Sequence, residues 1–141
     1  MSPRYELFDH TADLGIRLHA PTLEALIPLA AEALYAVIGE LVPERSAALA
    51  PVLLQFSGDS PDTLLRDYLA RLLLDFETRH QIFCDVMVHE FSDRALRAEG
   101  RFCPIDATRS IYHREVKAIT YHELAVRKTE GGYEATIIVD I

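Results

Sequence analysis

Apolar and polar residues alternate strictly near the start of the chain. One set of positions is apolar and the other is polar: Leu14, Ile16 and Leu18 against Asp13, Arg17 and His19. This period of two is typical of a strand that buries one face. The pattern therefore predicts a half-buried strand that begins at Asp13, after a short extended segment.

A helical spacing of apolar residues follows this strand. The positions are Leu23, Leu26, Ile27, Ala30, Leu34, Val37 and Ile38. Thr22 can cap such a helix, because its hydroxyl can accept a hydrogen bond from a free backbone N–H of the first turn. Pro28 lies inside the apolar stretch, so we expect a kink or an irregular first turn.

The clearest helix start is Ser60-Pro61-Asp62. Ser60 suits the N-cap, Pro61 suits the first helical position, and the carboxylate of Asp62 complements the helix dipole. The stripe that follows predicts an amphipathic helix facing the core: Leu64, Leu65, Tyr68, Leu69, Leu72, Leu73 and Phe76. A partner-binding helix is the alternative.

Extended segments dominate the rest of the chain. The predicted strands are 52–56, 83–91, 95–102, 119–127 and 133–141, with an alanine-rich link before the first and an exposed loop over 104–114. The stretch Glu130-Gly131-Gly132 indicates a hairpin between the last two. These elements predict an α+β fold of two layers, in which two main helices pack on one face of a mostly antiparallel mixed sheet.

The 141 residues and 50% hydrophobic composition predict a single domain over 1–141 whose core needs no disulfides or structural metal ions. The first residues lack a signal-like apolar stretch, no window is long and apolar enough for a membrane span, and Cys84 and Cys103 suggest two reduced thiols. We therefore expect a cytoplasmic protein without membrane contact. The net charge of −8 disfavours direct binding of nucleic acid and is compatible with a basic protein partner, or simply with solubility.

Conventional catalytic signatures are absent, and the six histidines lack the spacing of a zinc site. Three polar clusters remain: residues 10–13, residues 116–122 and the end of the chain. Asp13 opens a predicted strand and Asp140 almost closes one, so the two carboxylates could meet at strand ends. A turn-capping aspartate and an acidic terminus are the alternative interpretation.

At these clusters the chain resembles the archease family. The matching motifs are HTAD at 10–13 followed by Gly15, VKAITYH at 116–122, and a last strand that ends in Asp140-Ile141. The resemblance implies a non-catalytic activator of an RtcB-type RNA ligase, acting in tRNA splicing or RNA repair. Such an activator promotes guanylylation and repeated turnover of the ligase, and meets RNA only through it.

The resemblance also implies a metal site. Asp13, Asp140 and the backbone oxygen of Ile141 would bind a divalent cation, with Ca²⁺ expected first and Mg²⁺ or Mn²⁺ as alternatives; an all-oxygen ligand set suits these ions. Lys117 and His10 would contribute to activation or partner contact, whereas Tyr121 and His122 are interpreted as structural. A small metal-dependent phosphoester hydrolase and a chaperone-like binding module are the alternative functions. The oligomeric state is left open.

Overall fold

The computed structural model describes residues 2–45 and 49–141. In this part of the chain there are two helices and ten strands, and they follow one another as β1 (Arg4–His10), β2 (Asp13–Ala20), α1 (Leu26–Ile38), β3 (Gly39–Glu40), β4 (Val52–Ser57), α2 (Pro61–Arg79), β5 (Gln81–Phe91), β6 (Ala95–Pro104), β7 (Ile111–Tyr112), β8 (Ala118–Ile119), β9 (Ala125–Thr129) and β10 (Gly132–Asp140). Residues 46–48 of the predicted alanine-rich link lie outside the described residues.

The strands form three antiparallel sheets. The largest has the order β1-β2-β10-β8, and β9 also pairs with β10. A second sheet has the order β4-β6-β5, and β3 pairs with β7. The predicted α+β class, with two helices and antiparallel strands, is confirmed.

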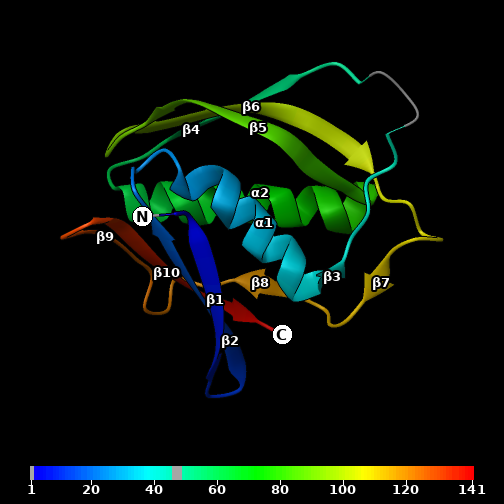
Figure 1. Cartoon of the computed structure of the whole chain (residues 1–141), viewed down its shortest axis with the longest axis horizontal. Helices are drawn as coiled ribbons and strands as arrows, with labels where there is room; N and C mark the ends of the chain where they lie inside the picture. Colours follow the sequence, from blue (N-terminus) through cyan, green and yellow to red (C-terminus); the bar gives the residue numbers. More distant parts are fainter. Residues whose placement is uncertain (1, 46–48) are drawn as a thin grey trace.

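Both helices lie between the two larger sheets (Figure 1). Helix α1 contacts β1 and β2 on one side and β5 on the other, while α2 contacts β8 on one side and β4, β5 and β6 on the other. The two helices thus pack on one face of each of two sheets, where the sequence pattern predicted two layers with a single sheet. The division of the strands into two sheets, with the second covering the far side of the helices, does not follow from the sequence pattern.

Helix α1 begins with the irregular turn that Pro28 predicts. The hydroxyl of Thr22 accepts a hydrogen bond from the backbone N of Ala25 at 3.2 Å, but regular helix begins only at Leu26. Pro28 therefore sits in the first turn, where its missing N–H costs no helical hydrogen bond.

Helix α2 begins at the predicted cap. Ser60 has extended backbone geometry, its side chain accepts a hydrogen bond from the backbone N of Thr63, and Pro61 is the first helical residue. The helix ends at Arg79, and the left-handed conformation of the next residue, His80, lets its N–H donate to the carbonyls of the last turn. No helix in the described part is long and apolar enough to cross a membrane.

Two predicted segments differ in the structure. The expected strand 119–127 is interrupted between β8 and β9 by a turn in which Glu123 has a φ of 51° and Thr120 caps the backbone N of His122. The expected loop 104–114 contains β7, and Ser110 accepts a hydrogen bond from the backbone N of Val42 at 2.8 Å. Both departures involve contacts between distant segments, since the Thr120 hydroxyl also donates to the carbonyl of Ile138 on β10.

Candidate functional site

Asp13 and Asp140 lie opposite each other where β2 begins and β10 ends. Side chains of directly opposed residues in an antiparallel pair share one face, with Cβ atoms about 5 Å apart. Both residues are partly buried. The fold thus brings together the two carboxylates that the family resemblance implies as metal ligands.

The burial pattern fixes this register. Leu14 lies opposite Val139 and Ile16 opposite Ile137, and all four side chains are buried on the face that meets the helices. A slip by one residue would turn this apolar set toward water. Asp13 and Asp140 therefore lie on the outer face of the sheet, away from the helices.

His10 extends the same row of residues on the outer face. It lies opposite Asp13 across the two-residue turn of Thr11 and Ala12, in which Ala12 has a φ of 62°. The Nδ1 atom of His10 is 3.9 Å from an Asp13 carboxylate oxygen. His10 thus belongs to the immediate surroundings of Asp13, as the sequence motif indicates.

The opposite side of His10 meets the turn between β8 and β9. Its Nε2 atom is 2.8 Å from a carboxylate oxygen of Glu123, and its ring meets the ring of His122 edge-on with centroids 5.2 Å apart. Sequence reasoning did not include His122 or Glu123 in the site. Both residues are far from His10 in the sequence, so no short-range motif could have indicated the contact.

Lys117 is held at the other side of Asp140. Its backbone N donates a hydrogen bond to the carbonyl O of Asp140 at 2.7 Å, and Ala118 lies directly opposite Asp140 in the β8–β10 pair. Lys117 is exposed and lines a cleft of about 210 Å³ with Arg66, Leu74 and other residues of α2. The structure thus anchors the backbone of Lys117 at the site and places the residue at a cleft beside α2.

Ile141 follows Asp140 at the end of β10 and is 37% exposed. Two carboxylates and a main-chain oxygen at this edge would form an all-oxygen donor set, which fits Ca²⁺ or Mg²⁺ better than softer metals. Three protein ligands do not complete the six to eight positions that Ca²⁺ takes. The arrangement could therefore hold such an ion only with water or partner groups in the remaining positions.

Gly15 lies next to this row for a steric reason. The ring of Phe8, its partner on β1, covers the position where a side chain at residue 15 would begin. The guanidinium of Arg17 lies 4.5 Å above the centre of the same ring. This stacked arrangement explains the glycine two residues after Asp13 and separates the carboxylate row from the charged residues further along the sheet.

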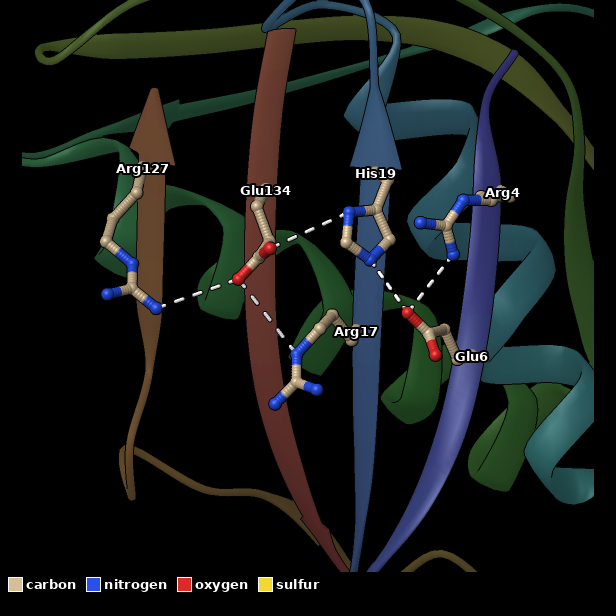
Figure 2. Close-up of polar contacts among 6 residues, drawn as sticks. All are labelled: Arg4, Glu6, Arg17, His19, Arg127 and Glu134. Carbon is tan, nitrogen blue, oxygen red and sulfur yellow. Dashed lines mark hydrogen bonds and ion pairs between the residues drawn. The ribbon is translucent and has the colours of Figure 1, made fainter. Parts of the chain in front are cut away.

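Those charged residues form a network on the outer face of the sheet (Figure 2). The imidazole of His19 contacts Glu6 at 2.8 Å and Glu134 at 3.7 Å, and Arg4 reaches Glu6 at 3.1 Å. The hydrogen bonds from His19 and Arg4 hold the pKa of the Glu6 carboxyl below its ordinary value of 4.5. The carboxylates of this network are thus matched by basic side chains.

Comparisons with known proteins identify relatives over nearly the full length of the chain. A sequence model of the Archease protein family matches residues 5–141. The protein archease of Methanosarcina mazei is 33% identical, with 98% of this chain and 96% of the relative covered. The protein archease of Methanopyrus kandleri is also 33% identical, with 97% and 99% covered.

Solved structures agree with the fold. The solution structure of Methanobacterium thermoautotrophicum protein 1598 superposes with a TM-score of 0.73 at 28% identity, covering 97% of this chain and 98% of the other. The crystal structure of a Thermotoga maritima archease, described as a possible chaperone, has a TM-score of 0.66 at 17% identity, with 96% of each chain covered, and supports the fold alone. With the family match and the curated relatives, these findings show that the chain belongs to the archease family.

Proposed function

We propose that this protein is a non-catalytic activator of an RtcB-type RNA ligase. It promotes guanylylation and repeated turnover of the ligase, in tRNA splicing or RNA repair, and uses a divalent cation held by Asp13, Asp140 and the backbone oxygen of Ile141. The protein acts in the cytoplasm and meets RNA only through the ligase. Membership of the archease family supports this assignment.

One observation carries the proposal. The antiparallel register sets Asp13 opposite Asp140, and the backbone N of Lys117 donates to the carbonyl of Asp140. Three motifs that are distant in the sequence, 10–13, 116–122 and 140–141, thus meet at one edge of the largest sheet. Cross-strand carboxylates repel each other unless a cation or proton lies between them. A bound cation would offset this repulsion between Asp13 and Asp140.

The chemistry of the edge favours completion by a partner. Few protein ligands are present for Ca²⁺, so coordination positions remain for water or for a phosphate oxygen brought by the ligase. The net charge of −8 suits docking onto a basic protein surface and does not favour an RNA backbone. In this proposal the ion and Lys117 act on the nucleotide bound by the ligase.

A multiple-turnover ligation assay tests the proposal. An RtcB-type ligase, GTP and an RNA substrate in excess are incubated with and without this protein, and the number of joined ends per ligase is counted. We expect stimulation by the wild type and its loss in Asp13→Asn, Asp140→Asn and Lys117→Ala. Formation of the ligase–GMP adduct should fall in the same variants.

Asp93→Asn is the matched control, because Asp93 is an exposed aspartate in the turn between β5 and β6 of the other sheet. This variant should stimulate ligation like the wild type. An absence of stimulation by the wild type, or full stimulation by the Asp13→Asn and Asp140→Asn variants, would exclude the proposal.

A chaperone-like binding activity is the second candidate. An apolar groove of about 400 Å³ is lined by Ile38, Phe76 and Tyr112 among other residues, and Tyr112 is 53% exposed. An exposed apolar groove can hold unfolded chain segments. Suppression of the aggregation of an unrelated heat-denatured protein, measured by light scattering and weakened by Tyr112→Ser, would favour this function.

A further inference from the structure

Two turns that are far apart in the sequence meet beside the carboxylate pair. The turn of the β1–β2 hairpin carries His10, and the turn between β8 and β9 carries His122 and Glu123. One potential ligand atom from each of these three residues lies within 4.8 Å of the others. This cluster is distinct from the all-oxygen set of Asp13, Asp140 and Ile141.

The donor atoms are two imidazole nitrogens and one carboxylate oxygen. Imidazole suits borderline ions such as Zn²⁺, Co²⁺ and Ni²⁺ much better than Ca²⁺ or Mg²⁺. Two histidines and one glutamate with water in the fourth position form a known tetrahedral zinc arrangement. The cluster therefore differs from the neighbouring oxygen set in the class of ion that it fits.

The surroundings of His10 already favour metal binding. Its Nε2 atom faces Glu123 at 2.8 Å, while its Nδ1 atom is buried and has no hydrogen-bond partner among the described residues. An Asp13 carboxylate oxygen lies 3.9 Å from this Nδ1 atom, just beyond hydrogen-bond distance. A metal-bound histidine commonly donates its other ring N–H to a carboxylate, which fixes the tautomer and the orientation of the ring. A small rotation of either side chain would bring the Asp13 carboxylate within hydrogen-bond distance of this Nδ1 atom.

Glu123 has an unfavourable backbone conformation. Its φ of 51° is in the left-handed region, which costs a residue with a Cβ about 1 kcal/mol or more. Its side chain is 57% exposed, so packing does not offset this cost. The turn is held by the Thr120 hydroxyl, which accepts from the backbone N of His122 at 3.1 Å. The result of this strained turn is a carboxylate aimed at His10.

We propose that His10, His122 and Glu123 bind a divalent transition-metal ion of the Zn²⁺ class. Asp13 orients His10, and water occupies the open coordination position. The site is separate from the Asp13, Asp140 and Ile141 cation site and does not depend on the activity proposed above. Asp13 links the two sites, because its carboxylate lies between Asp140 and His10.

Co²⁺ is a suitable probe, because its visible absorption reports coordination number and its ligand preference resembles that of Zn²⁺. The full chain is titrated with Co²⁺ in the Asp140→Asn background, which removes the oxygen set and keeps all three proposed ligands. We expect one equivalent to bind with strong tetrahedral d–d absorption, and Zn²⁺ to displace it. His122→Ala and Glu123→Gln should abolish the absorption, and Asp13→Asn should weaken affinity about 10- to 100-fold.

His113→Ala is the matched control. His113 is also exposed and lies 3.1 Å from a glutamate, Glu40, but belongs to no three-donor cluster among the described residues. This variant should bind Co²⁺ like its parent. Glu123→Gly provides a second variant at the strained position, because glycine accepts a positive φ; it should fold well and lose Co²⁺ binding. Equal Co²⁺ affinity in the parent and the His122→Ala variant, or binding without tetrahedral absorption, would overturn the proposal.

Discussion

Two buried tyrosines differ in whether their hydroxyls have hydrogen-bond partners. The Tyr35 hydroxyl accepts a hydrogen bond from the backbone N of Phe83 at 2.8 Å. The fully buried Tyr68 hydroxyl has no partner among the described residues. Burial raises the pKa of both phenols, so neither ionises near neutral pH.

This difference predicts opposite effects of the same substitution. Tyr35→Phe leaves the buried N–H of Phe83 unpaired and should lower the free energy of unfolding by about 1–3 kcal/mol. Tyr68→Phe removes a polar atom that lacks a partner and should be neutral or stabilising. Urea denaturation followed by circular dichroism measures both, and a large loss of stability in Tyr68→Phe would contradict the contrast.

Cys84 is partly buried on β5, near Cys103 on β6. Burial, followed by the proximity of Cys103, raises the pKa of the Cys84 thiol to about 12. The thiolate is the reactive form, so Cys84 should react with iodoacetamide at pH 8 at least about tenfold more slowly than a free cysteine. Site-resolved mass spectrometry measures this rate. In urea the difference should vanish, and rapid labelling of the folded protein would contradict the prediction.

Strands β1, β2, β9 and β10 present the polar network of the outer face as one unit (Figure 2). His19 is central, since it joins Glu6 of β1 to Glu134 of β10 and its side chain is only 13% exposed. We therefore expect His19→Phe to raise the pKa of Glu6 toward 4.5, because the bond from His19 is the largest cause of its lowering. Carboxyl titration by NMR measures the change, and Arg4→Gln should produce a smaller one.

The sign of the linked effect on stability follows from the direction of the shift. A carboxyl with a lowered pKa in the folded state adds stability above its unfolded value of 4.5, and this stability is lost as the pH falls through the lowered folded value. In His19→Phe this acid-dependent loss should be smaller. An unchanged pKa of Glu6 in that variant would show that the contact with His19 does not affect its ionisation.

The pattern of apolar and polar residues predicted most of the individual helices and strands, but few of the contacts between them. Ser60-Pro61-Asp62 marks the start of α2 because capping is a local property of the backbone. The break between β8 and β9 depends on Thr120, whose hydroxyl also donates to the carbonyl of Ile138 on β10. Such a contact has no signature in the surrounding sequence, so the run 119–127 resembled one strand.

In the molecule as a whole, local sequence patterns likewise do not predict which residues meet at the candidate site. The period of two around Asp13 predicts its face of the strand, but the choice of Asp140 as its neighbour depends on how β2 pairs with β10. Motif resemblance supplied that pairing before the structure did. Neither route brought His122 and Glu123 to His10, because their contact arises from two turns that meet only in the folded chain.

The cross-strand pairing of Asp13 and Asp140 also predicts how a cation affects the stability of the whole molecule. Without divalent ions, two opposed carboxylates repel each other, so Asp140→Asn should be neutral or stabilising by about 0.2–1 kcal/mol. With Ca²⁺ at about 100 times its Kd, the wild type should gain about 2.7 kcal/mol and the variant much less. Urea unfolding with chelator and with Ca²⁺ measures both changes.

The effect of Asp140→Asn on the free energy of unfolding should change sign between chelator and Ca²⁺. This change distinguishes a shared cation site from two independent aspartates at strand ends. An aspartate that merely caps a turn would lose stability on substitution with or without Ca²⁺, because its hydrogen bonds do not depend on the ion. Asp93→Asn should show equal effects of Ca²⁺ in variant and wild type, since Asp93 lies in the turn between β5 and β6. If Asp140→Asn behaved in the same way as Asp93→Asn, the two carboxylates would not share a cation.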